Sequence, residues 1–379
     1  MKTNKLLLIC ALLICGAIMG QSRYIYVSDA GGFNVEPWQV LRYDEDGSNP
    51  QVFIDNQFFV DNSVGWPQDI LFLEDQEVVL ISCLVGGRIT KHNATTGAYL
   101  EDFATVAGGP TRMKIGADGY IYVLQWSNTD NKVLRFEQDG TFVDEFTSVG
   151  VSQSIGLDWD SDGYLYVSSY GGSSVRMFDT EGMDMGLFID SELGGPTNIH
   201  FNDQGELIVL DWSQANVERF AANGDYLGEW TNGINQVEGL DVHPDTGNYF
   251  LGAGALGRID EFTPDGTFVQ TVVESGSGGL IQPNAVIFRD AILSVPDFDK
   301  EQAVLVMPTL GNQFNWINQT EFRFEEAHIM NLSGAVIDTL KLSEQTNWNA
   351  SNRSNGIYFV VAVDELGNRR TQKIVVKNR

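Results

Sequence analysis

Cysteine is scarce in this chain, which excludes a fold held together by disulfides. Of the three cysteines in 379 residues, Cys10 and Cys15 lie in an N-terminal apolar stretch that we expect to be removed. Cys83 then remains alone, and a single thiol cannot build a disulfide framework. We expect it to lie at a strand end as a small buried hydrophobe.

Histidines and nucleophile motifs are also scarce. The four histidines, His92, His200, His243 and His328, show no close metal-ligand spacing, which disfavours a zinc site. No Gly-x-Ser-x-Gly elbow occurs, so serine hydrolysis has no support in the sequence. A long amphipathic helical pattern is missing as well, which favours an all-β fold.

Positive charge is in deficit. The chain carries 23 Lys and Arg against 51 Asp and Glu, for a formal net charge of -28. This balance repels nucleic acid and anionic lipid, so we expect neither as a partner. It favours solubility outside the cell. Binding of a cation or of a basic partner is the alternative interpretation.

Residues 1–22 are predicted to be a secretory signal peptide. Lys2 and Lys5 precede an apolar stretch over residues 6–19, and small or polar residues follow it at 20–22. The apolar stretch is shorter than the roughly 20 residues that a bilayer demands. We therefore expect export, and no transmembrane segment in the mature chain.

The dominant positive feature is an internal repeat. Pro67 and Pro110 are 43 residues apart, and Pro196 follows after twice that interval. One copy contains four apolar runs, over residues 110–115, 120–126, 132–136 and 141–146, and an Asp-Gly turn separates the first run from the second and the third from the fourth. Such runs joined by Asp-Gly or Asn-Gly predict a four-stranded antiparallel sheet. Sheets repeated at this period stack radially and close into a propeller.

The ends of the repeat array supply one shared sheet. Residues 23–28, 38–43 and 51–54 match the second, third and fourth strands of a copy, and residues 283–288 match a first strand. Five complete sheets and this shared one predict a six-bladed β-propeller. Seven blades follow instead if residues 291–295 begin a separate sheet.

The predicted propeller domain, residues 23–298, resembles the NHL-repeat family. Residues 118–123, Asp-Gly-Tyr-Ile-Tyr-Val, and 162–167, Asp-Gly-Tyr-Leu-Tyr-Val, match that repeat's core of Asp-Gly-x-hydrophobic-Tyr-Val. The resemblance covers residue 23 to about residue 288 and implies the fold. It leaves the function open, because this scaffold hosts binding proteins, lyases and lactonases.

A different pattern follows residue 298 and predicts a small Ig-like β-sandwich over residues 299–379. Gly356-Ile357-Tyr358 and the terminal Lys373-Ile374-Val375-Val376 resemble the C-terminal sorting domain of the type IX secretion system of Bacteroidetes. That family usually opens with Pro-Asn-Pro, where this chain has Val306-Met307-Pro308. The resemblance implies an export label read by the type IX machinery, and a secreted or cell-surface location. An ordinary Ig-like accessory domain is the alternative.

The propeller topology also predicts where a ligand binds. In an antiparallel blade the starts of first strands and the ends of second strands meet on one face, around the channel. Polar groups with aromatic neighbours at a concave mouth are the usual composition of a ligand site. The candidate binding residues at this mouth are Asp29, Asp69, Arg112, Gln125, Trp126, Tyr170, Asn198, Asp211, Trp212, Glu238 and Asn284, with Trp66, Ser82 and Ser169 beside them.

These residues predict a binding module that recognises a glycan or a protein at the channel mouth. The competing interpretation of the tryptophans is that they pack between blades as repeat residues. A third hypothesis is that the blades act only as a spacer in a matrix or adhesin. Enzymatic activity stays open, with binding favoured.

The enzymatic alternative rests on a second resemblance, to gluconolactonase-like six-bladed propellers. Those proteins hold a divalent metal at the channel with Glu, Asn and Asp, and oxygen ligands are available here at Asn198, Asp211, Glu238 and Asn284. The motifs of that family are not matched residue by residue. The function implied is a metal-dependent hydrolase or lactonase.

A calcium turn is the remaining cofactor hypothesis. Asp158, Asp160 and Asp162 open a D-x-D-x-D-G sequence, whose alternate carboxylates can converge on one calcium ion. The twelfth position of such a loop needs a bidentate acid and is Ser169 here, so plain turn chemistry is the alternative.

A second ring of polar residues is expected one pleat along the first strands. Lys114, Asp158, His200 and Asp241 occupy equivalent places near the channel axis. We expect them to hydrate the channel or to pair with one another, rather than to act in catalysis.

Overall fold

The computed structural model describes residues 23–291, 305–317, 324–332, 334–342, 347–364 and 369–378. The chain divides into two compact units, Met1–Ala291 and Ile292–Arg379. The predicted signal peptide and residues 292–295 of the predicted seventh sheet lie outside the described residues.

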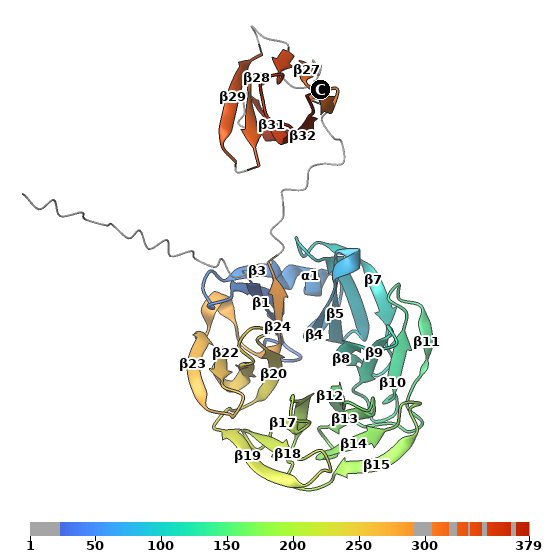
Figure 1. Cartoon of the computed structure of the whole chain (residues 1–379). Coiled ribbons are helices and arrows are strands. Elements are labelled where there is room, and N and C mark those ends of the chain that lie inside the picture. The colour runs from blue at the N-terminus through green and yellow to red at the C-terminus, as the bar shows by residue number, and fades with distance from the viewer. Residues whose placement is uncertain are drawn as a thin grey trace, which may run out of the picture. The chain divides into compact units, whose positions relative to one another are not determined.

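The first unit is a ring of six four-stranded antiparallel sheets within residues 23–291 (Figure 1). Each sheet is one blade of a β-propeller, which confirms the predicted fold and blade number. Blade 1 is β24 (Pro283–Asp290), β1 (Arg23–Asp29), β2 (Gln39–Asp44) and β3 (Gln51–Ile54). Blade 2 is β4 (Gly65–Leu73), β5 (Val78–Val85), β6 (Arg88–Asn93) and β7 (Tyr99–Thr105). Blade 3 is β8 (Pro110–Ile115), β9 (Ile121–Gln125), β10 (Val133–Phe136) and β11 (Phe142–Glu145).

The remaining blades follow the same order, with the first strand of each nearest the channel (Figure 1). Blade 4 is β12 (Ser154–Trp159), β13 (Leu165–Ser169), β14 (Ser174–Phe178) and β15 (Asp184–Ile189). Blade 5 is β16 (Pro196–Phe201), β17 (Leu207–Asp211), β18 (Asn216–Phe220) and β19 (Tyr226–Asn232). Blade 6 is β20 (Val237–Val242), β21 (Tyr249–Ala253), β22 (Arg258–Phe262) and β23 (Phe268–Val273).

Helices are short throughout the described residues, as the sequence predicts. The helix α1 (Asn56–Asp61) begins after Asp55, whose side chain accepts a hydrogen bond from the backbone N–H of Phe58. The other three are single 3₁₀ turns: η1 (Glu74–Gln76), η2 (Gly254–Leu256) and η3 (Ser277–Gly279).

Blade 1 is assembled from both ends of the propeller, as predicted. β1 pairs antiparallel with β24 in a register that runs from Arg23 opposite Asp290 to Asp29 opposite Pro283. Arg23 and Asp290, 267 positions apart in sequence, also share a side-chain hydrogen bond of 2.8 Å. This pairing completes the blade and closes the ring.

Apolar cores fill the spaces between neighbouring blades. Val27 of β1 packs in one core with Phe250 and Ile259 of blade 6. Tyr26, on the opposite face of β1, packs edge-on against Phe72 of blade 2, with ring centroids 4.9 Å apart. Because successive residues of a strand point to opposite faces, β1 is shared between two cores.

Glycine supplies left-handed backbone in the hairpin turns, as the Asp-Gly motifs predict. Gly119 and Gly163 join the first and second strands of blades 3 and 4 with φ of +84° and +85°. Other residues are strained in this region. These turns lie at the end of the channel that we call the turn face. The end with the first-strand starts and second-strand ends is the mouth face.

Every inner strand of the six blades carries a β-bulge near its start. In blade 3, Pro110 lies opposite Gln125 but Met113 lies opposite Val123, so β8 holds one residue more than β9. Equivalent shifts occur in the inner strands of the other blades. A bulge re-aims side chains and bends the strand. The bulges contain four of the predicted mouth residues: Arg112, Asn198, Glu238 and Asn284.

The second unit joins two sheets through one apolar core, which fits the predicted Ig-like sandwich. The ring centroids of Phe314 and Trp348 in the first sheet lie 5.7 Å apart. Both rings pack with Ile329, Val360 and Ile374 of the second sheet. The first sheet is β25 (Val306–Met307), β27 (Gln313–Trp316) and β30 (Asn347–Asn349). The second is β26 (Leu310–Gly311), β32 (Arg369–Val376), β31 (Gly356–Asp364), β28 (Phe324–Asn331) and β29 (Val336–Lys341).

We predict that Val27→Ala destabilises the propeller, because Val27 is 0% exposed between blades 1 and 6. Removing its two methyl groups should lower the free energy of unfolding by about 2 kcal/mol. Val52→Ala in β3 of the same blade is the matched control, since Val52 is 54% exposed. It should cost less than about 0.5 kcal/mol. Denaturant titration measures the free energy of unfolding of both variants. Equal losses of this free energy would contradict a ring closed by β1.

Candidate functional site at the propeller channel

The ends of the second strands clamp the loops of the mouth face. In blade 5, Asp211 accepts hydrogen bonds of 2.6 to 3.0 Å from the backbone N–H groups of Gly194, Gly195, Ser213 and Gln214. These groups precede β16 and follow β17. Asp211 therefore ties two loops together, and it is 0% exposed.

The equivalent residues of other blades act in the same way. Asp29 accepts from the N–H groups of Gly31, Ile281 and Gln282, so it joins the loop after β1 to the loop before β24. Burial raises the pKa of Asp29, and these hydrogen bonds oppose that rise. Gln125 similarly bonds backbone groups of the loops before β8 and after β9. Three predicted binding residues are thus built into loop structure.

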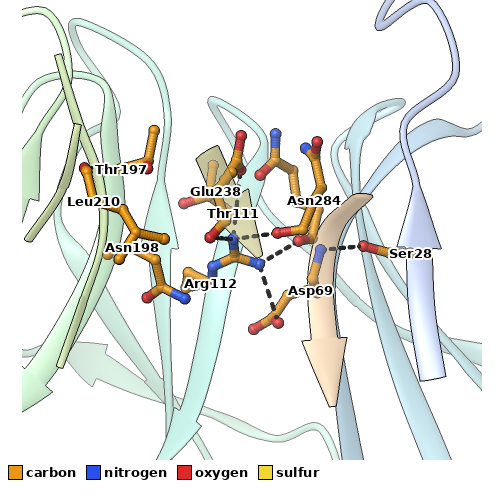
Figure 2. Close-up of polar contacts among 12 residues, drawn as sticks. Ser28, Asp69, Thr111, Arg112, Thr197, Asn198, Leu210, Glu238 and Asn284 are labelled. Carbon is orange, nitrogen blue, oxygen red and sulfur yellow. Dashed lines mark hydrogen bonds and ion pairs between the residues drawn. The ribbon is translucent and has the colours of Figure 1, made fainter. Parts of the chain in front are cut away.

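Arg112 lies across the channel (Figure 2). Its guanidinium donates to the backbone oxygens of Gln68 and Asn284, both at 2.5 Å, and of Glu238 at 3.3 Å. It also pairs with the carboxylates of Asp69 at 3.3 Å and Glu238 at 3.5 Å. The side chain thereby links blade 3 to blades 1, 2 and 6. We call these five residues the channel plug; four of them were predicted at the mouth.

Gln68 joins the plug to the aromatic residues of the mouth face. In the amide orientation that satisfies both its polar atoms, Gln68 donates to Glu238 at 2.7 Å. Its oxygen accepts from the Trp66 indole at 2.7 Å and from the Asn284 amide at 3.1 Å. Gln68 is buried. Gln68 was not predicted from the sequence, because a lone glutamine in an apolar strand carries no chemical signature.

The plug contains two carboxylates and one guanidinium. Burial raises the pKa of Asp69, against the lowering effect of Arg112. Burial also raises the pKa of Glu238 to about 7, with Arg112 lowering it and Asp69 raising it further. Near neutral pH Glu238 is therefore partly protonated, which brings the buried cluster close to electrical balance.

Aromatic side chains gather on the mouth face beside the plug. Phe33, in the loop between β1 and β2, packs against Trp66 and Trp212 with ring centroids 5.0 and 5.7 Å away. Because Trp212 belongs to blade 5, this loop of blade 1 reaches across the channel; Figure 1 shows it as a blue loop inside the ring. Trp126 and Tyr170 form a neighbouring pair 5.9 Å apart. All five rings are half-buried.

Two members of this cluster have strained backbones. Phe33 and Trp66 have φ of +64° and +48°, a region that bulky residues rarely adopt. Such conformations cost about 1–3 kcal/mol each and concentrate at ligand sites and switch regions. Hydrogen bonds restrain both: the Trp38 indole donates to the Phe33 backbone oxygen at 2.7 Å, and Trp66 donates to Gln68. Phe33 was not predicted from the sequence, because it lies in no repeated position.

A cavity of about 300 Å³ occupies the channel on the turn-face side of the plug. Its lining includes residues of the plug, polar residues of the predicted second ring, and apolar residues of blades 1, 2 and 6. The aromatic residues of the mouth face are not among the lining residues. Of the predicted mouth residues, Asp69, Arg112 and Asn198 line it, together with Lys114, His200 and Asp241.

Three members of the predicted second ring form a network. The Asp158 carboxylate accepts from the Lys114 ammonium at 2.6 Å and from the Phe201 N–H at 2.8 Å. It lies 3.4 Å from Nδ1 of His200. Burial opposes ionisation of Asp158, but Lys114 and His200 outweigh it and lower its pKa to about 2. Asp158 is therefore ionised, and its hydrogen-bond and ion-pair partners all lie within this network.

Asp241, the fourth member, has a different environment. Its carboxylate accepts from the backbone N–H groups of Val242 at 2.8 Å and Phe288 at 2.7 Å. Burial raises its pKa to about 6, although these hydrogen bonds and the nearby His200 and Lys114 lower it. Asp241 is thus held by backbone groups and faces the cavity.

The predicted calcium turn has ordinary turn geometry. Asp160 accepts from the N–H groups of Asp162 and Tyr164 and from the Tyr166 hydroxyl, whereas Asp158 bonds residues at the channel. The three carboxylates do not bring ligand atoms within 4.8 Å of one another. Turn chemistry accounts for this motif.

One group of acidic and histidine side chains elsewhere does meet that spacing within the described residues. Glu45, His243 and Asp245 place one ligand atom each within 4.8 Å of the others. Arg23 pairs with both acids, and Nε2 of His243 donates to the Glu45 carboxylate at 2.7 Å. This group is an ion-pair cluster between blades 1 and 6.

The predicted four-residue metal set is divided among these structures. Asp211 is bonded to loop backbone, and Glu238 faces Arg112 and Gln68 in the plug. The Asn198 side-chain oxygen accepts from the Ile199 N–H at 3.0 Å. The side-chain oxygen of Asn284 is buried without a hydrogen-bond partner in the described part of the chain.

Comparison with known families identifies the second unit. Residues 311–377 match the secretion system C-terminal sorting domain. These residues are a type IX sorting domain. The sorting domain directs the protein through the type IX system to the cell surface or the medium. Across the described residues, no helix is both long and apolar enough to cross a membrane.

Solved structures share the fold of the propeller. A chain from the crystal structure of a nidogen/laminin complex matches with a TM-score of 0.56 and 11% identity, covering 70% of this chain and 98% of its own. A protein of unknown function from Bacteroides caccae matches with a TM-score of 0.56 and 14% identity, covering 71% and 100%. At these identities the likeness concerns the fold alone. Comparison with curated proteins gives no match.

We predict that Glu238→Gln raises the thermal stability of the protein at pH 8. The pKa of Glu238 is about 7 in the folded state against 4.5 for the ordinary group, so its ionisation destabilises the fold as pH rises through 7. Between pH 5 and pH 8, the melting temperature of the variant should therefore fall less than that of the wild type. Glu137→Gln, at an exposed position, is the control. If the melting temperatures of Glu238→Gln and the wild type changed equally between pH 5 and pH 8, the raised pKa of Glu238 would be refuted.

We predict that removing residues 306–379 prevents export across the outer membrane, because this segment contains the sorting domain, residues 311–377. Immunoblots of cell fractions and medium from the native host measure the distribution. Conversely, a fusion of residues 299–379 to an unrelated exported reporter should send that reporter to the surface or medium. Normal release of the truncated propeller would show that another signal directs export.

Proposed function

We propose that this protein is a secreted binding protein that holds a neutral glycan against the aromatic residues of the mouth face. The observation that supports this most is the convergence of the half-buried rings of Phe33, Trp66 and Trp212 from blades 1, 2 and 5. Flat apolar area beside hydrogen-bonding groups is the composition expected of a ligand site. A protein segment is the alternative ligand that such a surface fits.

The supporting structure beneath these rings favours binding. Trp66 is fixed to Gln68, and Gln68 to Glu238 and Asn284, so the ring rests on the plug. Phe33 and Trp66 keep strained backbones, which persist only where surrounding structure determines them. A platform rigid before binding loses little conformational freedom when the ligand arrives.

The charge of the chain narrows the ligand class. A net charge of -28 repels acidic polysaccharides and nucleic acids at low and moderate salt. A neutral sugar chain meets no such repulsion. We therefore infer a neutral glycan rather than an acidic one.

The metal-dependent hydrolase alternative has less support. Its four proposed ligands include Asp211, which is bonded to four backbone N–H groups, and Glu238, which faces Arg112. A metal at these positions would have to displace both sets of bonds. Treatment with EDTA separates the two functions, since glycan binding at the aromatic rings should survive it.

Substitution of the aromatic residues tests the proposed site. A screen of neutral glycans and peptides on the purified protein identifies the ligand, and Phe33→Ala and Trp212→Ala should each weaken its binding at least tenfold, about 1.4 kcal/mol. Phe142→Ala is the control, because Phe142 is 53% exposed on the outer strand β11. Melting temperatures verify folding. Undiminished glycan binding by Phe33→Ala and Trp212→Ala would refute this site.

A further inference from the structure

The channel cavity contains one carboxylate without a cationic partner. Lys114 is paired with Asp158 at 2.6 Å, and Arg112 is held by the plug. Among the ion pairs of residues 23–291, none includes Asp241. Its bonds from backbone N–H groups hold it in place but do not neutralise it. The channel wall therefore carries an excess of negative charge at Asp241.

Asp241 retains the capacity to bind a cation. Each of its carboxylate oxygens accepts one backbone hydrogen bond, from Val242 or from Phe288, and a carboxylate oxygen accepts more than one. His200 of blade 5 also lines the cavity, and its Nδ1 lies 3.4 Å from the Asp158 carboxylate. Asp241 itself lines the cavity.

Apolar residues of the inner strands also line the cavity. Leu71 of blade 2, Val286 and Ile287 of blade 1, and Val242 of blade 6 line it. At about 300 Å³ the space is at the small end of the range for ligand pockets. A compact hydrocarbon body fits this part of the wall and would be shielded from water there.

Arg112 of the plug lies at the inner end of the cavity. It is 5% exposed and lines the cavity, while its Nε is itself buried and has no hydrogen-bond partner within the described part of the chain. Arg112 therefore limits the depth of the cavity without offering this donor to a molecule inside it.

The turn face gives access to this space. The Lys114 side chain is 42% exposed and the His200 side chain 27%, although both line the cavity. A small molecule can therefore enter from the turn face without displacing the plug or the aromatic residues.

We propose that the channel is a second binding site, for a small primary amine with a compact apolar body, whose ammonium group pairs with Asp241. The hydrocarbon part of the amine lies against Leu71 and Ile287. This site is separate from the glycan site proposed at the mouth face, since the plug lies between them.

Calorimetric titration of the purified full-length protein with three matched probes tests this proposal. Cyclohexylamine supplies the ammonium group, cyclohexanol is its neutral analogue, and cyclohexanecarboxylate carries the opposite charge. We expect cyclohexylamine to bind at least tenfold more tightly than cyclohexanol, and the carboxylate to bind more weakly than either. Equal binding of the amine and the alcohol would overturn the proposal without any variant.

Two variants locate the site. Asp241→Asn should weaken cyclohexylamine binding at least tenfold, whereas Asp190→Asn, at an exposed acid outside the channel, should leave it unchanged. Leu71→Phe keeps Asp241 and fills cavity volume, so it should also weaken binding, which covers the case that Asp241→Asn fails to fold. Tighter binding of cyclohexanecarboxylate than of the amine would overturn the proposal, as would calcium binding that excludes the amine and is lost in Asp241→Asn.

Discussion

The antiparallel pairing of β1 with β24 is the interaction on which the rest of the propeller depends. It places residues 23–29 beside residues 283–290 and turns a linear series of sheets into a ring. Only a closed ring directs six inner strands toward one axis. The plug follows from this closure, because Arg112 of blade 3 donates to Asn284, a residue that β24 brings back to the first blade. Asp29 reinforces the closure by bonding Ile281 and Gln282.

The plug gives the ring a preferred arrangement of blades. Arg112 contacts groups of blades 1, 2 and 6, all of them buried. A buried ion pair adds little net stability, but a buried guanidinium left without partners costs several kcal/mol. An arrangement with a blade missing or displaced would leave Arg112 in that state. We therefore interpret the plug as a determinant of blade order and number rather than as a large source of stability.

The sequence predicts the fold better than the site, and particular residues show why. The repeat period and the Asp-Gly turns report local geometry, so the six blades and the shared blade 1 could be predicted. Asp69, Arg112, Glu238 and Asn284 were all predicted at first-strand starts, but their contacts with one another depend on the bulges, and bulges leave no mark in the sequence. Phe33 belongs to a loop outside the repeat.

The position of the cavity was beyond prediction for a related reason. The sequence identifies both ends of each inner strand equally well, and nothing in it shows that Arg112 fills one end. Once that side chain lies across the channel, the two ends differ in chemistry. The mouth face has aromatic rings over a nearly balanced cluster, and the turn side has polar groups with Asp241 uncompensated.

The plug also provides contacts through which ligand binding at one end of the channel can influence the other end. Trp66 at the mouth face is hydrogen-bonded to Gln68, and Gln68 to Glu238, whose pKa of about 7 makes its charge sensitive to small changes nearby. Arg112 contacts Glu238 from within the same cluster and also lines the cavity. A ligand that draws Arg112 toward the cavity would remove positive charge from Glu238 and favour its protonation. Because Glu238 accepts the hydrogen bond from Gln68 that positions Trp66, the same shift would reach the aromatic surface through contacts that are already in place.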